Sequence, residues 1–476
     1  MGKVKKQEIP MWAQMGHKKP TTRREFLGYG IIPFAAYLTM PSMLSLLVSP
    51  DANAADCSAA GAASMCSFIT LNLAGGGSMS SNYLPRDAGG NPLPSYDRMG
   101  MGNNTGANAL TFDTEFGVTG WATANGNALG QLLVGIRGTS TPEALANTAF
   151  FAVCVQSQDD TNSNRFDASG LVFKGGLVGS LIPNLGRRAS ATGLNQMASY
   201  INPPPPLIVG SFADLQGSIA YTRALQTSLS ATQRTKLARL VSNLSASQAR
   251  KLASVNSTAQ VKNLVECAGI KNVELSSGAP IDPLANAAVA TAWGINNGTA
   301  ANNESRVFAS MVYNGILGQA GSINLERGGY DYHNGTRTTG DQQDLAAGQV
   351  IGRILETAKI LGKKVMVYVT SDGSVVSNTD AAPGAVWTSD RGSAGMAMVF
   401  AYDPAGRPAT RGAQIGHYTA GQVADDRTLV GNSPELAAQA VFANWCSFNG
   451  NIGAFEKVVT NGTIRGPLVD EVLRIG

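Results

Sequence analysis

Asp331 and His333 are the residues whose types and spacing best suit chemistry. They lie two positions apart, just after an apolar run over residues 322–327 that breaks at Gly328-Gly329. A carboxylate and an imidazole are common ligands of zinc and other divalent ions. His333 is also one of only three histidines in the chain. The pair therefore predicts one part of a metal site.

The other candidate residues lie in polar or Gly-rich loops beside apolar runs of strand length, at residues 67–73, 365–370 and 394–402. Asp372 and Asp390 would add carboxylates to the metal site, where a divalent ion would polarise an ester oxygen and activate a water. Ser78 ends a glycine loop whose backbone amides suit an anion. The competing interpretation is that these aspartates are turn and cap residues, since Asp-Gly at 372–373 is a common turn pair.

Other catalytic arrangements find less support. His417 either joins the site or is a hydrogen-bonded loop residue, and we favour the loop residue. A Ser-His-Asp hydrolase is disfavoured, because no Gly-x-Ser-x-Gly elbow occurs and few histidines are present to act as a base. The glycine loop before Ser78 lacks the lysine of a nucleotide-binding P-loop.

A predicted β-α-β unit places two of these loops at one edge of a sheet. The strand at 322–327 leads to a helix over about residues 342–361 and then to a strand at 365–370. Asp341 is expected to cap the start of this helix, and Gly362 its end. Such units cross over right-handed, so both acidic loops emerge at the carboxyl edge, where open α/β sheets bind ligands.

The rest of the chain predicts a three-layer α/β/α fold with a mostly parallel sheet. Further apolar runs of strand length cover residues 132–136 and 150–155, whereas 79–128 read as long loops. The helical composition of the segment from about 210 to 270 predicts a helical insertion. It is either a lid or a simple helical hairpin packed on the sheet. Shorter helices are expected at 284–294, 304–318 and 433–445.

Charge argues against a nucleic-acid partner. Charged residues make up 14% of the chain, and the formal net charge is +4. Residues 1–54 carry seven Lys/Arg and three Asp/Glu, which accounts for all of that excess. The remainder is close to neutral and has no basic stripe.

The chain has five cysteines but no Cys-x-x-Cys pair, so a thiolate zinc site is not expected. Cys57 and Cys66 could close a small disulfide loop.

Residues 1–54 predict a twin-arginine signal peptide. Arg23-Arg24 precede an apolar run from about Tyr29 to Val48, and Ala52-Asn53-Ala54 form a small-x-small cleavage site. We therefore expect the twin-arginine translocase as a partner and a periplasmic or secreted protein, exported after folding. A membrane anchor is the alternative. Prolines interrupt the run, and no later stretch approaches the ~20 apolar residues that span a bilayer.

At the motifs around Asp331, Asp372 and Asp390, the chain resembles the bacterial family known as domain of unknown function 1501, whose members are exported by the twin-arginine route. That family is itself similar to the alkaline phosphatase/sulfatase superfamily. The resemblance is carried by Gly328-Gly329-Tyr330-Asp331-Tyr332-His333, Ser371-Asp372-Gly373 and Asp390-Arg391-Gly392. It implies an alkaline-phosphatase-like core over residues 55–476. It also implies hydrolysis of phosphate or sulfate esters with one divalent metal ion at Asp331, His333, Asp372 and Asp390.

The chain departs from the family pattern at several ligand positions. Gly77-Ser78 stand where the family has an aspartate, Asn164-Arg165-Phe166 replace Ser-His-Phe, and Asp390-Arg391 replace Asp-His. An arginine can bind phosphate or sulfate bidentately, or it can form an ion pair with Asp331 or Asp390. Three functions therefore remain open. They are a metal-dependent ester hydrolase, a non-catalytic binder of a small anionic ester through Arg165 and Arg391, and an exported assembly protein.

Overall fold

The computed structural model describes ten ranges of the chain, together with a few isolated positions between 230 and 247. The ranges are residues 66–102, 111–123, 130–158, 163–175, 182–187, 206–218, 282–331, 337–377, 387–460 and 462–476. The predicted signal peptide and most of the predicted insertion at 210–270 lie outside these ranges.

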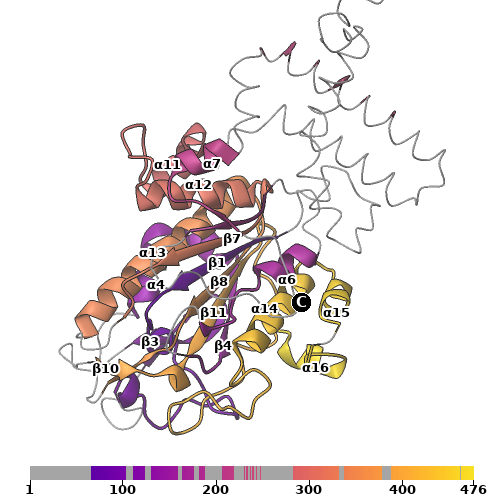
Figure 1. Cartoon of the computed structure of the whole chain (residues 1–476). Helices are drawn as coiled ribbons and strands as arrows, with labels where there is room; N and C mark the ends of the chain where they lie inside the picture. Colours follow the sequence, from indigo (N-terminus) through magenta and orange to yellow (C-terminus); the bar gives the residue numbers. More distant parts are fainter. Residues whose placement is uncertain are drawn as a thin grey trace, which may run out of the picture.

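A single eight-stranded sheet runs through the molecule (Figure 1). Its strands are parallel except β11, which is antiparallel to both neighbours. In spatial order they are β12 (Gln414–Ile415), β4 (Thr148–Cys154), β11 (Met396–Tyr402), β8 (Val365–Ser371), β1 (Ser67–Leu73), β7 (Ala320–Arg327), β5 (Ile182–Gly186) and β6 (Leu207–Ile208). The predicted mostly parallel sheet is confirmed.

The central strands are buried on both faces. All seven residues of β1 are buried, and Ile69 and Leu71 face one core while Phe68 faces the other. Side chains alternate between faces along a strand, and Phe68 is in register with Met366 of β8. Met366 accordingly lies in the same core as Phe68. Burial on both faces explains the continuous apolar runs of these strands.

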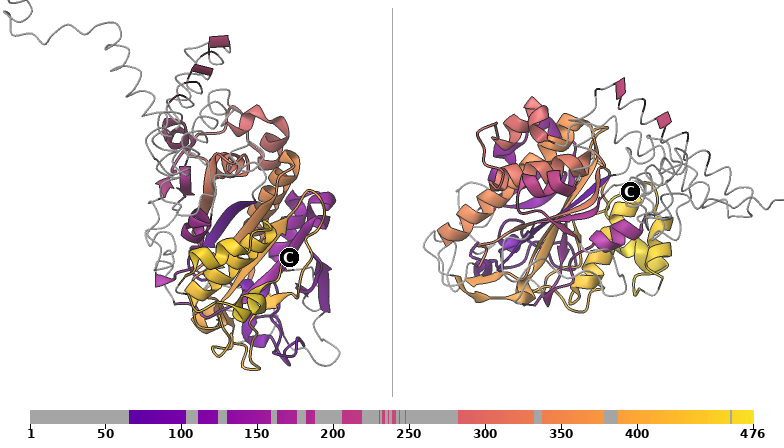
Figure 2. Two further views of the ribbon diagram at one scale, coloured as in Figure 1. Left: turned by 90° about the vertical axis from the view of Figure 1, so that its right-hand side faces the viewer. Right: turned by 45° about the horizontal axis from the view of Figure 1, so that its top comes forward.

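Helices cover both faces of the sheet, as the two views of Figure 2 also show. The first face carries α4 (Gln131–Thr139), α5 (Pro142–Ala146), α7 (Phe212–Ser218), α11 (Ala287–Trp293), α12 (Glu304–Ile316) and α13 (Arg337–Leu361). The second carries α6 (Ser169–Lys174), α14 (Pro434–Phe448), α15 (Gly453–Val458) and α16 (Pro467–Val472). The protein is a three-layer α/β/α structure.

The run Leu132–Ile136 is helical, so the strand predicted there is wrong. It forms α4, which packs closely against α13. Glycines make the approach possible. A Cβ at Gly135 would overlap the backbone of Leu345, and a Cβ at Gly348 would overlap that of Leu132. The apolar run therefore reflects one buried helix face rather than a strand.

The β7-α13-β8 unit is confirmed, although its helix is longer than expected. Helix α13 begins at Arg337, so Asp341 lies within its first turns and does not cap it. At the other end, Gly362 has φ +60°, and the Lys363 amide donates to Ala358 O at 3.0 Å. Gly362 thus ends the helix as predicted.

Two small hairpins lie outside the main sheet. Residues 79–128, expected to be loops, contain β2 (Thr111–Glu115) and β3 (Val118–Thr123). Trp121 of β3 is fully buried and contacts Phe150 and Phe400 of the sheet. The second hairpin joins β9 (Val375–Ser377) to β10 (Trp387–Asp390). The first hairpin thus packs on the sheet, and the second leads directly to Arg391.

The cysteines of the described ranges are thiols. Cys66, Cys154 and Cys446 are free and buried. Cys57, the predicted partner of Cys66, lies outside the described residues, so the expected disulfide loop finds no support here. Among the residues that the structure describes, no helix is long and apolar enough to cross a membrane.

Candidate functional site

Four of the predicted site residues lie in loops at the carboxyl edge of the sheet. The loops that carry Ser78, Asp331 and Asp372 follow β1, β7 and β8, which are parallel. Arg391 precedes β11, which runs the opposite way and so begins at this same edge. The edge includes the end where β10 is labelled in Figure 1. The topology thus brings together loops that are far apart in sequence.

Asp331 and Asp372 lie on either side of Gly75. The Gly75 amide donates to Oδ1 of Asp372 at 2.9 Å. Gly75 has φ +113°, and a Cβ built on it would lie 2.6 Å from the Asp331 amide nitrogen. Asp372 is buried and Asp331 is exposed. The fold therefore brings together two of the four predicted metal ligands.

The other two ligands cannot be placed. His333 lies outside the described residues, and only the backbone of Asp390 is described, where it pairs with Val375 in the hairpin. Within the described ranges, no group of three or more His, Cys, Asp or Glu residues gathers to hold a metal ion. Asp331 and Asp372 fit part of a hard-cation site, and the metal remains a prediction.

Ser78 belongs to a chain of buried hydroxyls. Its Oγ lies 3.1 Å from Oγ of Ser374, which lies 3.3 Å from Oγ of Ser80. All three serines are buried. Among the described residues, no histidine or carboxylate is hydrogen bonded to these hydroxyls. They can bind a ligand, but no described base activates one of them as a nucleophile.

Arg391 is the unusual residue of this edge. It is 9% exposed, and its backbone amide donates to Ser374 O at 2.6 Å. Its Nη2 donates to Gly421 O at 3.0 Å, whereas its buried Nη1 has no hydrogen-bond partner. No described carboxylate forms an ion pair with it. Burial, together with the positive charge of Arg98, lowers the pKa of Arg391.

Tyr418 lies beside Arg391 and anchors the backbone at Ala394 and Gly395, just after Arg391. The phenol oxygen is 2.6 Å from Ala394 O and 2.9 Å from Gly395 O, to which it donates. Burial raises the pKa of Tyr418, and the nearby charge of Arg391 counteracts part of this rise. The single phenol hydrogen is thus taken by two backbone carbonyls, which leaves the serine hydroxyls and the buried guanidinium as the donors for a ligand.

Arg165 has a described ion-pair partner. Its side chain is 43% exposed and forms a 3.6 Å ion pair with Glu435 in the first turn of α14. Exposed pairs of this kind contribute little to stability. A role for Arg165 beside Arg391 in an anion site stays a prediction.

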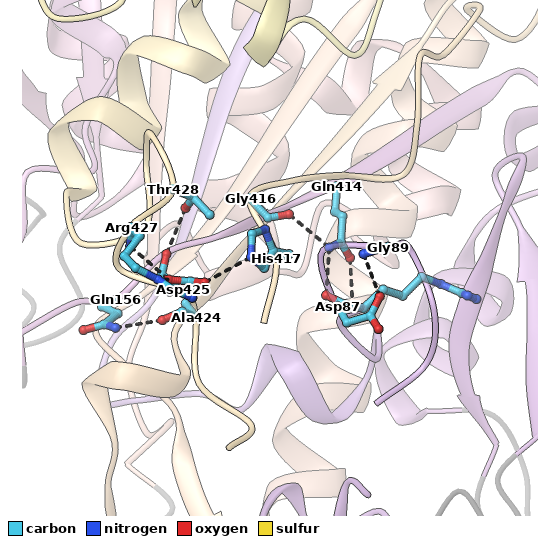
Figure 3. A network of polar contacts seen from close by, with 11 residues as sticks. Asp87, Gly89, Gln156, Gln414, Gly416, His417, Ala424, Asp425, Arg427 and Thr428 are labelled. Atoms are coloured by element: carbon cyan, nitrogen blue, oxygen red, sulfur yellow. Dashed lines mark hydrogen bonds and ion pairs between the residues drawn. The ribbon is translucent and has the colours of Figure 1, made fainter. Parts of the chain in front are cut away.

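His417 is a hydrogen-bonded loop residue, as we favoured. It follows β12 at the carboxyl edge, and its Nε2 donates to Asp425 Oδ2 at 3.1 Å (Figure 3). Arg427 binds the same carboxylate through Nε at 2.8 Å and Nη2 at 2.6 Å. These bonds, led by those from Arg427, hold the pKa of Asp425 far below its usual value. The network fixes the loop that carries Tyr418.

Three residues of the site were missed from the sequence. Ser374 and Tyr418 carry no motif, although Ser374 follows Asp372-Gly373 at a predicted strand end. Arg98 lies in a region read as loop, far from Arg391 in sequence. The proximity of Arg98 to Arg391 depends on tertiary structure and leaves no signal in a single sequence.

Comparisons with protein-family models, with curated proteins and with solved structures found no match. The resemblance to an exported family therefore stays a prediction, carried by the motifs alone.

Proposed function

We propose that the protein binds a small oxyanion or its ester, of the phosphate or sulfate type, at the carboxyl edge of the sheet. One observation carries this proposal. The guanidinium of Arg391 is buried, its Nη1 has no partner, and no described carboxylate compensates its charge. A buried charge without a partner is costly, and an anion bound to Nη1 removes that cost.

The groups around Arg391 suit an anion. Ser374, whose carbonyl accepts from the Arg391 amide, extends a line of hydroxyls through Ser78 and Ser80. Arg98 adds a second positive charge, close enough to influence Arg391. Arginine N–H groups match the oxygens of phosphate and sulfate, and charge-assisted bonds to them are strong. The ligand class follows from this set of donors.

Binding without turnover is the function this arrangement favours. The serine hydroxyls bond to one another, and among the described residues none has a base as its partner. A hydroxyl needs such a base, or a metal ion, to become a nucleophile. The proposal is therefore a binding protein.

A metal-dependent ester hydrolase is the second candidate. It is favoured by the approach of Asp331 and Asp372 around Gly75. With His333 and Asp390, these residues would hold a divalent ion, which supplies Lewis acidity towards an ester oxygen. Arg391 would then orient the ester rather than retain a free anion.

We also propose that the protein works outside the cytoplasm, after export by the twin-arginine translocase. Arg23-Arg24, the apolar run and the Ala52-Asn53-Ala54 site support this. Replacing both arginines with lysine should leave the protein in the cytoplasmic fraction. Unchanged export of that variant would contradict the route.

Titration and turnover separate the two functions. The purified protein would be titrated with sulfate and phosphate, analysed for metal, and assayed with aryl phosphate and aryl sulfate. Binding lost in Arg391→Gln, without turnover, supports the binding function. Turnover lost in both Asp331→Ala and Asp372→Ala supports the hydrolase. Neither binding nor turnover would contradict both and leave the assembly role.

A further inference from the structure

A second group of buried polar side chains lies on the face of the sheet covered by α6 and α14. Thr70 of β1 is in register with Asn324 of β7 on one side and with Tyr368 of β8 on the other. Residues paired in register across parallel strands point to the same face. Each is at most 3% exposed. Polar side chains thus replace apolar ones across three adjacent strands of a buried face.

Asp167 brings a carboxylate to this group. It lies just before α6, and its Oδ2 accepts a 3.0 Å bond from Nδ2 of Asn324. Its Oδ1 accepts from the Ser169 amide at 2.7 Å. Asp167 is buried, and in the described part of the chain no lysine or arginine pairs with it. Its negative charge therefore has hydrogen-bond donors but no cation.

Three oxygen atoms of this group have no partner. They are Thr70 Oγ1, Asn324 Oδ1 and Tyr368 Oη, all buried and without a hydrogen bond. The amide of Asn324 is fixed in orientation, because its Nδ2 donates to a carboxylate that can only accept. Its Oδ1 is then the atom of this amide that is left for a ligand. Leaving a buried polar group unsatisfied is costly, so three such oxygens on one buried face point to a ligand.

Tyr368 lies close to Asp167. Burial raises the pKa of Tyr368, and the charge of Asp167 raises it further. The phenol is therefore neutral and offers an oxygen lone pair. Burial likewise raises the pKa of Asp167, although its bonds from Ser169 and Asn324 oppose the rise.

We propose that Asp167, Thr70, Asn324 and Tyr368 form a binding site for one hard cation, of the Ca²⁺ or Na⁺ type. The available atoms are all oxygens, namely a carboxylate, an amide carbonyl and two hydroxyls, which are the ligands such ions prefer. A buried water would bond to the orphan oxygens but would not stabilise the ionised form of Asp167. A cation does both.

This site is separate from the one proposed for the anion. None of its four residues belongs to the loops of Asp331, Asp372 or Arg391. Its position between the sheet and α6 gives the ion a structural role, since it would join three strands to the second helical layer. Binding is accordingly expected to raise the unfolding temperature.

The test uses the full mature chain after removal of ions with a chelator and dialysis into a choline buffer. Ca²⁺ and Na⁺ are then added separately, and binding is followed by calorimetry and thermal unfolding. We expect one ion per chain and a higher unfolding temperature with one of the two. Asp167→Asn should weaken binding by about tenfold or more, because ligand charge sets affinity. Tyr368→Phe, which keeps the ring packing, should weaken it less.

Two controls make the result decisive. Asp331→Asn should leave this binding unchanged, which distinguishes the site from a metal at the carboxyl edge. Thr70→Val introduces a side chain of the same shape as threonine. This variant keeps the carboxylate of Asp167 but loses one oxygen ligand, so it should bind the ion more weakly. Failure of both ions to bind the native chain, or equal binding by native and Asp167→Asn protein, would overturn the proposal.

Discussion

The backbone amide of Gly75 donates a 2.9 Å hydrogen bond to Oδ1 of Asp372, 297 residues further along the chain. This bond joins the loop after β1 to the loop after β8. On its other side, Gly75 touches the backbone of Asp331, so one glycine sets the spacing of two acidic loops. Such proximity converts an ordinary turn aspartate into a candidate ligand.

Gly75→Ala should therefore disturb the edge. The substitution combines φ +113° with a Cβ 2.6 Å from the Asp331 amide nitrogen. We expect a loss of about 2–5 kcal/mol in the free energy of unfolding and faster amide exchange at residues 329–331. Gly90→Ala is the control, since Gly90 has φ +77° but nothing within 4 Å of the added atom. Equal losses in the two variants would contradict a role for the contact with Asp331.

The contact between α4 and α13 predicts opposite effects for two glycines of one helix. Gly135→Ala would overlap the backbone of Leu345 and should cost about 1–3 kcal/mol of stability or more. Gly138→Ala, with nothing within 4 Å, should stabilise by about 0.5–1 kcal/mol because alanine favours helix. Urea unfolding of both variants measures the difference. Similar values for the two would argue against the close packing.

Asp425 gives a pH dependence with a defined sign. Its pKa is lowered in the folded protein, chiefly by bonds from Arg427 and then by His417 among smaller influences. Its stabilising contribution is therefore complete above the unfolded pKa of about 4. That contribution is lost as the pH falls from there towards the lowered pKa of the folded protein. The stability difference between native protein and Asp425→Asn should be constant above about pH 5 and shrink below about pH 4. Arg427→Gln should show a similar profile, whereas a difference that grows on acidification would contradict the assignment.

The β-α-β unit from β7 to β8 was predictable because each of its signals is local. The apolar runs, the helical periodicity of α13 and the stop at Gly362 all lie within about fifty residues, a compact β-α-β unit. The run Leu132–Ile136 misled because five consecutive apolar or small residues fit a buried strand as well as a helix face. Its partner glycines on α13 lie more than two hundred residues away, where a single sequence gives no indication of contact.

The candidate site, like the fold, was predictable from the sequence only where its signals are local. The motifs located Asp331, Asp372 and Arg391 at the correct edge, because strand ends are visible in the sequence. They could not reveal that Arg391 has no carboxylate partner among the described residues, or that Arg165 pairs with Glu435, since ion pairs depend on tertiary contacts. The buried oxygens around Asp167 were also missed. Their signal, polar residues alternating within the strands at Thr70, Asn324 and Tyr368, is visible in hindsight.

Arg391 itself should contribute little to stability when no anion is present. Removing a buried charge that has no ion-pair partner among the described residues relieves its desolvation, and of the described side-chain bonds it sacrifices the one to Gly421 O. Arg391→Met in a buffer free of oxyanions should change stability by less than about 1 kcal/mol, or raise it. Arg306→Met is the matched control, because it leaves Asp282 without its 2.8 Å partner and should destabilise. A loss of more than about 2 kcal/mol in Arg391→Met would assign that residue a structural role.

Calorimetric titration of the mature protein with sulfate and with phosphate, at constant ionic strength, tests the central claim most directly. The native protein and Arg137→Gln, which loses an arginine paired with Asp113 and Glu115, should bind one oxyanion with the same affinity. Arg391→Gln should bind it about 10- to 150-fold more weakly, as expected for the loss of charge-assisted bonds worth about 1.5–3 kcal/mol. Equal affinity in Arg391→Gln and native protein, or no saturable binding to the native protein, would contradict the account.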